Sequence, residues 1–133
     1  MKKVLAFGTF DQLHPGHLNF LKQAKKYGAV FVVVARDQTV KKKKGRLPKQ
    51  KEKKRLNEIK KTGLVTKVFL GNLQNKYLSL KKIKPDIICL GYDQIFFTKD
   101  IPKKIKEFNL KTKIIRLKAY KPNIYKSSKI KIE

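Results

Sequence analysis

The sequence predicts an α/β domain built on a doubly wound, Rossmann-like sheet of five parallel strands. Three observations predict it: the chain has 133 residues, its apolar residues (41%) occur in short separate blocks, and strand-like blocks alternate with helix-like segments. Such alternation is typical of a parallel sheet covered by helices on both faces. The length is that of one domain, so we expect residues 1–133 to form a single unit.

Five short blocks rich in β-branched or aromatic residues predict the strands, and Gly, Pro or Asp bound them. The block at 29–35 is almost entirely apolar, as expected of a strand buried on both faces. The predicted strands are residues 3–7, 29–35, 66–70, 86–90 and 112–117.

Helical spacing of apolar residues predicts helices between these strands. The first ends at Gly28, a residue that commonly stops a helix. The lysine-rich segment 41–55 is expected to form a mobile loop followed by the start of the second helix. The predicted helices are residues 16–28, 49–63 and 100–110, with a shorter helical turn at 75–83.

The charge balance is strongly basic, with 35 Lys and Arg against 9 Asp and Glu and a formal net charge of +26. Such a surface attracts polyanions and binds nucleic acid non-specifically at low salt. Alternatively, the lysines are a general surface property without a macromolecular partner, and they steer anionic small molecules. We favour the second interpretation.

No apolar run approaches the roughly 20 residues of a membrane span, and the N-terminal segment lacks the pattern of a signal peptide. We expect no membrane association and a cytoplasmic location. Cys89 lies in the apolar run DIICLG and is expected to be a small core residue without a chemical role.

The stretch GTFDQLHPGH, residues 8–17, contains both histidines of the chain and follows the first predicted strand. A loop that leaves a strand and enters a helix presents backbone N–H groups and the positive end of the helix to a phosphate. Gly8 and Gly16 allow close approach of a ligand, and Pro15 rigidifies the turn. His14 and His17 can both donate hydrogen bonds to one bound anion.

Two alternatives stay open for the histidine pair. Zinc binding would require Cys89 and Asp11 to complete the ligand set, because no other histidine exists. A structural role would place the imidazoles as a helix cap or in the core.

GTFD followed by HPGH resembles the signature of the nucleotidyltransferase superfamily. This superfamily includes glycerol-3-phosphate cytidylyltransferases, pantetheine-phosphate adenylyltransferases and archaeal-type FAD synthetases. Further similar segments follow in the expected order: 32–46, Arg55, 84–94 and 125–130. The chain departs from the pattern at the helix after the basic segment, which opens with Glu52 as its single acidic residue where several are usual.

The resemblance implies that a phosphate oxygen of an acceptor attacks the α-phosphate of a nucleoside triphosphate, with Mg²⁺ present, and that pyrophosphate leaves. His14 and His17 would hold the phosphates and stabilise the developing charge. The amides around Thr9 and Phe10 would contact the α-phosphate, and Asp11 would orient the loop or a magnesium-bound nucleotide.

The resemblance extends to residues farther along the chain. Lys44, the favoured lysine of the run 41–44, would close over the phosphates, and Ser127 and Ser128 would donate to the β- and γ-phosphates. Asp93 would serve the base or the acceptor, and Arg116 the phosphates or base. Structural alternatives are a turn for Asp93, an exposed edge-strand cation for Arg116 and helix caps for the serines.

Three features favour the archaeal-type FAD synthetases, which transfer AMP from ATP to FMN. They are the stretch ARDQTVKK, the glutamine in GYDQ and the long connection from Arg116 to Ser127, whose two tyrosines could stack on a base or a flavin. The alternative is a CTP-dependent cytidylyltransferase acting on glycerol 3-phosphate or a similar phospho-alcohol.

Two other classes remain open: a basic nucleic-acid-binding module and a nucleotide sensor without turnover. The first leaves HPGH unexplained, and its aromatic residues would have to lie between lysines on an exposed sheet. Family members are often dimers, so the resemblance is compatible with a homodimer, although the sequence does not show its own oligomeric state.

Overall fold

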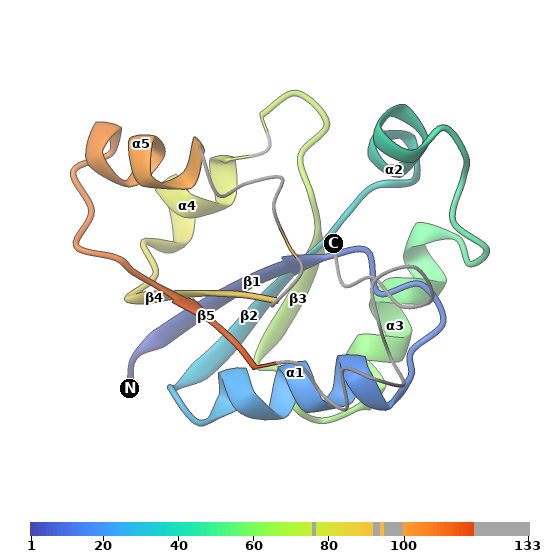
Figure 1. The fold of residues 1–133 in the computed structure, drawn as a ribbon, viewed down its shortest axis with the longest axis horizontal. Helices are drawn as coiled ribbons and strands as arrows, with labels where there is room; N and C mark the ends of the chain where they lie inside the picture. The colour runs from blue at the N-terminus through green and yellow to red at the C-terminus, as the bar shows by residue number, and fades with distance from the viewer. Residues whose placement is uncertain (76, 92–93, 95–99, 119–133) are drawn as a thin grey trace.

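The computed structural model describes residues 1–75, 77–91, 94 and 100–118, in which strands alternate with helices (Figure 1). The strands are β1 (Lys3–Gly8), β2 (Ala29–Val34), β3 (Lys67–Leu70), β4 (Ile87–Leu90) and β5 (Lys113–Arg116). The helices in the described residues are α1 (Pro15–Lys25), α2 (Asp37–Lys44), α3 (Glu52–Lys61), α4 (Leu78–Ile83) and α5 (Asp100–Glu107). Every strand boundary lies within one residue of the prediction from the sequence.

The five strands form one parallel sheet in the order β3-β2-β1-β4-β5. From β1 the chain builds outward to β2 and β3, then crosses back to add β4 and β5 on the other side of β1. The direction of winding therefore reverses between β1 and β4. In open α/β sheets, ligands bind outside the carboxyl ends of the strands at such a point. The predicted doubly wound parallel fold is confirmed.

The sheet is buried on both faces, because side chains of successive strand residues point to opposite sides. Val4 and Ala6 of β1 belong to the core that α1 and α3 cover, whereas Leu5 and Phe7 belong to the core under α4 and α5 (Figure 1). Cys89 is fully buried in the first of these cores, and burial raises the pKa of its thiol to about 12. The thiol is therefore protonated at neutral pH, in agreement with its predicted role as a core residue.

The lysine run 41–44 was expected to be a loop, and this prediction is wrong. These residues form the second half of α2, which ends where Gly45 adopts a left-handed conformation with φ of 78°. Lysine is a good helix former, so the segment needs no apolar stripe to be helical. Val40 is the one buried residue of α2, and hydrophobic periodicity therefore gave no signal for this helix.

Gly28 connects α1 to β2 at a position where the backbone leaves no space for a side chain. Its φ is +153°, and a Cβ atom there would lie 2.2 Å from the carbonyl oxygen of Lys2. The same Lys2 carbonyl accepts the N–H of Ala29, so it cannot move away without loss of that hydrogen bond.

We predict that Gly28→Ala lowers the free energy of unfolding by about 2–4 kcal/mol, because backbone strain and overpacking act together. Gly63→Ala is the matched control, since Gly63 also has a positive φ (70°) but no atom within 4 Å of the added Cβ. Its cost should be about 1 kcal/mol. Urea denaturation of both variants measures the difference, and equal costs would contradict the close approach at Gly28.

Candidate functional site

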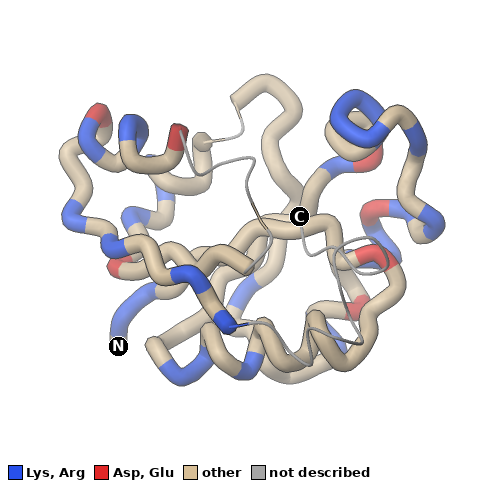
Figure 2. Tube along the Cα trace, in the orientation of Figure 1, with Lys and Arg blue, Asp and Glu red and all other residues tan. Residues whose placement is uncertain are grey.

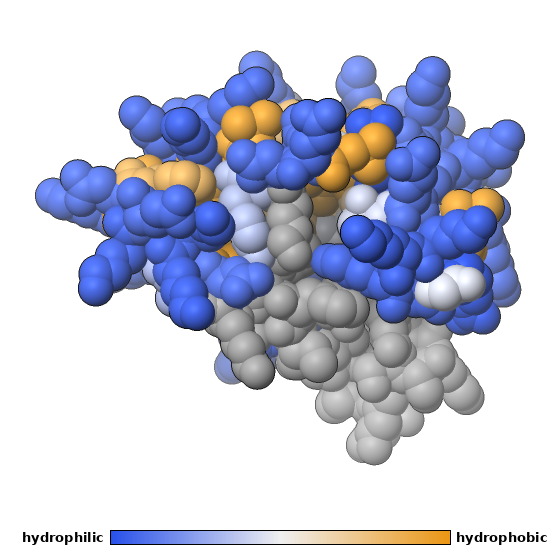
Figure 3. Space-filling view, turned by 90° about the horizontal axis from the view of Figure 1, so that it is seen from above, coloured by the Kyte–Doolittle hydropathy of each residue, from blue (hydrophilic) through white to orange (hydrophobic). Residues whose placement is uncertain are grey.

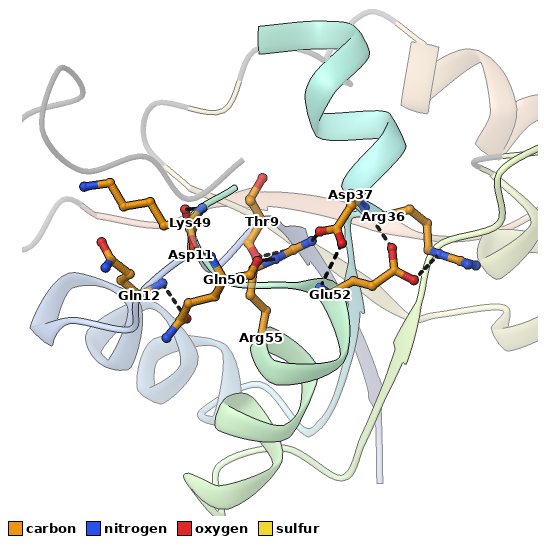
Figure 4. A network of polar contacts seen from close by, with 9 residues as sticks. All are labelled: Thr9, Asp11, Gln12, Arg36, Asp37, Lys49, Gln50, Glu52 and Arg55. Atoms are coloured by element: carbon orange, nitrogen blue, oxygen red, sulfur yellow. Dashed lines mark hydrogen bonds and ion pairs between the residues drawn. The ribbon is translucent and has the colours of Figure 1, made fainter. Parts of the chain in front are cut away.

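The loop between β1 and α1 is held in an unusual backbone conformation. Phe10 and Gln12 have positive φ angles of 52° and 55°, which residues other than glycine adopt only where surrounding contacts enforce them. The Phe10 side chain is fully buried in the core next to α1. The Asp11 carboxylate accepts the N–H groups of Lys49 and Gln50 at 2.8 and 2.9 Å (Figure 4). A buried ring and a carboxylate therefore fix the loop from two sides.

His14 caps the amino end of α1 through its side chain. Its Nδ1 atom accepts the N–H of Gly16 at 3.0 Å and the N–H of His17 at 3.4 Å. Pro15 occupies the first helical position, where the missing N–H costs nothing. The capping role that the sequence left as an alternative for the histidines is therefore real for His14.

This cap determines the protonation of the His14 ring. Because Nδ1 accepts hydrogen bonds, the ring proton lies on Nε2, and the imidazole is neutral. Burial lowers the pKa of His14 below its ordinary value, which disfavours a second proton. The ring thus accepts from the helix through one nitrogen and carries a donor on the other, a combination suited to a phosphate oxygen near the positive end of a helix.

His17 lies directly beside His14. The two rings stack with centroids 3.6 Å apart and planes inclined by 26°, and the ring of Phe10 meets His17 edge-on at 5.4 Å. The side chain of His17 is buried, with 1% exposure. Two positively charged imidazolium rings at this distance would repel each other. Protonation of both rings at once would therefore raise the free energy of the folded state.

Arg55 of α3 joins three segments of the chain beneath this loop (Figure 4). Its guanidinium is fully buried and donates to the carbonyl of Thr9 at 2.8 Å, the carbonyl of Gln50 at 2.9 Å and the carboxylate of Asp37 at 2.7 Å. These bonds use all three nitrogens of the guanidinium. Arg55 therefore positions the loop after β1 and the start of α2.

The first residues of α2 and α3 cap each other. The Glu52 carboxylate accepts the N–H of Asp37 at 2.9 Å, and the Asp37 carboxylate accepts the N–H of Glu52 at 3.2 Å (Figure 4). Glu52 also forms an ion pair with Nε of Arg36 at 3.0 Å. Neither helix has a side-chain cap from its own N-cap residue. Glu52 therefore caps α2 and Asp37 caps α3, and each carboxylate accepts one of the backbone N–H groups that a helix leaves without a partner at its amino end.

Beyond the carboxyl end of β4, the side chain of Gln94 connects the chain to the end of β1. Its buried carboxamide donates to the carbonyl of Phe7 at 2.8 Å and accepts the N–H of Gly91 at 2.7 Å. Arg116, at the end of β5, donates through Nη1 to the carbonyls of Gly91 and Gln94, both at 2.7 Å. Gly91 and Gln94 are thus tied to β1 and β5, the strands on either side of β4.

The structure brings most of the predicted site residues to one edge of the sheet. Arg116 lies two strands away from β1, and Lys44 is the last residue of α2, which follows β2. Asp93, Ser127 and Ser128 lie outside the described residues. The residues that lie together at the end of β1 are Gly8, Thr9, Phe10, Asp11, His14, Gly16 and His17.

Several of these residues have structural duties that the sequence did not reveal. The Gly16 amide donates to His14, and both Asp11 oxygens accept backbone N–H groups. Arg116 is exposed, as the structural alternative expected, but its Nη1 is committed to two carbonyls. The predicted contacts of all three with nucleotide stay predictions.

Sequence reasoning missed the polar network formed by Arg36, Asp37 and Glu52, and the bridging role of Gln94. One signal was available: acidic residues are scarce in this chain, yet Asp37 and Glu52 flank the most basic segment.

The part of the chain that the structure describes holds no cluster of three or more His, Cys, Asp or Glu side chains that could bind a metal ion. The zinc alternative therefore has no complete ligand set among these residues.

A family model described as cytidylyltransferase-like matches residues 5–132. The chain belongs to this family. The FAD synthase of Methanohalophilus mahii is 44% identical over 118 residues, which cover 88% of this chain and 82% of that protein. The FAD synthase of Methanobrevibacter smithii is 46% identical over 125 residues, covering 90% and 81% respectively. The resemblance to archaeal FAD synthetases within this family is confirmed.

Solved structures agree with the fold of this cytidylyltransferase-like chain. A Thermoplasma volcanium protein described as a lipopolysaccharide core biosynthesis protein matches with a TM-score of 0.83 and 40% identity, over 90% of this chain and 98% of that one. The pantoate-beta-alanine ligase of Francisella tularensis matches with a TM-score of 0.60 and 20% identity, over 87% and 59%. The second likeness concerns the fold alone. Within its described residues, this family member has no helix long and apolar enough to cross a membrane.

We predict that Arg55→Met lowers the free energy of unfolding of this cytidylyltransferase-like protein by about 2–4 kcal/mol, because Asp37 and two carbonyls lose their donor. Lys104→Met is the control. Its ion pair with Glu107 is partly exposed, and its ammonium lies 5.7 and 5.9 Å from the ring centroids of Tyr77 and Phe108, so the loss should be at most about 1 kcal/mol. Equal losses in urea denaturation would contradict the central position of Arg55.

Stability should fall as the pH drops below about 6.5, because the unfolded chain protonates His14 at its ordinary pKa and the folded chain only at a lower pH. We predict that His14→Asn weakens this pH dependence, since asparagine caps a helix but does not titrate. The measurement is the free energy of unfolding at about pH 7.5 and about pH 5.5. Lys22→Asn, on the exposed side of α1, should keep the wild-type dependence. An unchanged pH dependence in His14→Asn would refute the assignment.

Proposed function

We propose that this chain is an FMN adenylyltransferase that converts ATP and FMN to FAD and pyrophosphate. A phosphate oxygen of FMN attacks the α-phosphorus of ATP, a new P–O bond forms, and the bond to the β-phosphate oxygen breaks as pyrophosphate leaves. The observation that carries the proposal is the stacked pair of His14 and His17 at the carboxyl end of β1, next to the point where the winding reverses. The FAD synthases among its relatives support FMN as the acceptor.

His14 has the central role in the proposed reaction. Its neutral ring directs the Nε2 proton away from the helix and can donate to an oxygen of the reacting phosphate, where negative charge grows in the transition state. His17 stacks on it, holds the ring plane and adds a second imidazole to the phosphate site. The amides around Thr9 and Phe10 would bind the α-phosphate, because Arg55 and the buried Phe10 ring fix the loop that carries them.

Basic residues would then balance the charge of the two anionic substrates. The lysines of α2, with Lys44 at its end, follow β2 at the same edge of the sheet, and a field of this sign steers anions toward the site. We keep Ser127 and Ser128 as donors to the β- and γ-phosphates, Asp93 on the side of the base or acceptor, and Arg116 as a further phosphate or base contact.

Magnesium enters this proposal as a companion of ATP. Mg²⁺ is usually held by substrate phosphates with one or two carboxylates, so the lack of a metal cage among the described residues is compatible with a Mg–ATP substrate. When bound, the ion neutralises part of the triphosphate charge. Asp11 is the carboxylate residue of the loop after β1. Its two oxygens accept the backbone N–H groups of Lys49 and Gln50.

A cytoplasmic location, where ATP and FMN are available, belongs to the same proposal. So do a single domain over residues 1–133, a homodimer, and an affinity for nucleic acid that is non-specific and falls with salt. Light scattering at two protein concentrations tests the dimer.

The experiment crosses ATP and CTP with FMN and glycerol 3-phosphate in the presence of Mg²⁺ and measures pyrophosphate release. We expect release with ATP and FMN alone, and FAD as the second product. Release with CTP and glycerol 3-phosphate would replace the proposal with a cytidylyltransferase. Nucleotide binding without any release would identify a sensor.

His14→Asn and His17→Ala should each lower turnover by about 100- to 1,000-fold, the usual cost of removing one transition-state donor. Because asparagine keeps the helix cap, His14→Asn should remain folded, which far-ultraviolet circular dichroism checks. Near-normal turnover in this variant would disprove the role of the His14 donor.

A further inference from the structure

A cavity of about 570 Å³ opens at the carboxyl ends of β2 and β3, beside α4; neither histidine lines it, and Arg36 is the one residue of the polar network that does. We propose that this cavity binds the isoalloxazine ring of the flavin acceptor. The inference rests on the proposed function, because it assumes a flavin as the acceptor, and it assigns a place to the part of FMN that does not react.

The position of the cavity fits an acceptor whose phosphate lies at the histidines. Val33 of β2 and Leu70 of β3 line it, and these strands follow β1 in the sheet. Neighbouring strands are about 4.8 Å apart, so the end of β3 lies roughly 10 Å from the end of β1 along the same edge. The ribityl chain of FMN separates its ring from its phosphate and can span such a gap. The ring and the reacting phosphate would therefore occupy two neighbouring sites on one edge.

One part of the cavity wall is apolar. Val33, Phe69, Leu78 and Ile83 contribute side chains from β2, β3 and α4. From the side that looks onto this edge, apolar side chains reach the surface between hydrophilic ones (Figure 3). Ligand sites of this size usually combine apolar walls with a few polar groups that fix orientation. The dimethylbenzene end of the flavin needs such a wall.

The polar groups suit the other end of the ring, which carries two carbonyl oxygens and an N–H. The hydroxyl oxygen of Ser79, on α4, is buried and has no hydrogen-bond partner among the described residues. A buried hydroxyl that meets no protein partner is uncommon and calls for a ligand or water. Asn72 uses its side-chain oxygen to accept the N–H groups of Gln74 and Asn75, which leaves its NH₂ group as a donor at the cavity.

The charges of the lining favour an anionic acceptor. Arg36 and Lys82 are its cations, and the described residues of the lining include no acidic side chain. Arg36 is held in place by Glu52 and by the carbonyl of Gly71 at 3.4 Å. The network that orders the loop after β1 therefore also fixes one cation of the cavity, so both proposed sites share a support.

The test is Ser79→Leu, which fills the cavity, with Lys81→Leu on an exposed part of the same helix as the matched control. Flavin fluorescence measures binding of FMN and of riboflavin, which has the ring but no phosphate, and calorimetry measures binding of Mg–ATP. We expect Ser79→Leu to weaken both flavins by at least about tenfold and to leave Mg–ATP binding unchanged, while Lys81→Leu changes neither.

The result distinguishes this inference from the proposed function. If wild-type protein makes FAD but Ser79→Leu keeps its KM for FMN, the cavity assignment is overturned and the reaction stands. If no FAD forms, yet riboflavin binds and Ser79→Leu weakens it, the cavity assignment stands and the reaction is wrong. Loss of Mg–ATP binding in a folded Ser79→Leu variant would assign the cavity to adenine and overturn the inference.

A second pair of variants covers the case in which Ser79→Leu does not fold. Lys82→Glu reverses a surface charge at the cavity, and Lys81→Glu makes the same change next to it. We expect a several-fold loss of FMN affinity in the first and little change in the second, at low salt. Equal effects of the two reversals would overturn the cavity assignment.

Discussion

The buried guanidinium of Arg55 connects the parts of the molecule on which the candidate site depends. Three segments that are distant in sequence, the loop after β1, the residues before α3 and the start of α2, meet at its three nitrogens. A planar group with donors in fixed directions can hold three acceptors at once, and a lysine could not reproduce this geometry. Breaking such a buried arrangement leaves polar groups unpaired, so the fold and the site are stabilised by the same contacts.

The reciprocal capping of α2 and α3 extends this arrangement outward. Two positive helix ends would repel each other if they met without compensation, and here the carboxylates of Asp37 and Glu52 lie between them. Because Glu52 also binds Arg36, the chain of contacts continues to Gly71 at the end of β3. The start of α3 is therefore connected by polar contacts both to the loop after β1 and to the lining of the cavity beside α4.

The sequence was informative where local patterns decide the structure. Apolar blocks defined all five strands, and the reading of residues 8–17 as a strand-to-helix loop was correct because glycine, proline and the preceding strand act locally. The helix at 37–44 was missed because it buries only Val40. The pairing of Asp37 with Glu52 spans 15 residues and depends on how two helices meet, which no spacing rule predicts. The cavity was missed for a similar reason, since Val33 and Ser79 line one cavity only because of how β2 and α4 are arranged in the fold.

The arrangement of charge along the helices distinguishes the amino end of α1 from those of α2, α3 and α5. α2, α3 and α5 each have an acidic residue in the first turn, and all described helices have lysines in the last turn (Figure 2). This order follows the helix dipole, and it neutralises the positive ends of those three helices from within the protein. α1 has no acidic residue in its first turn, and its cap is the neutral ring of His14. α4 also lacks one, but it has six residues. The positive end of α1 is therefore not cancelled by a carboxylate of its own first turn, and the group that caps it is a neutral imidazole.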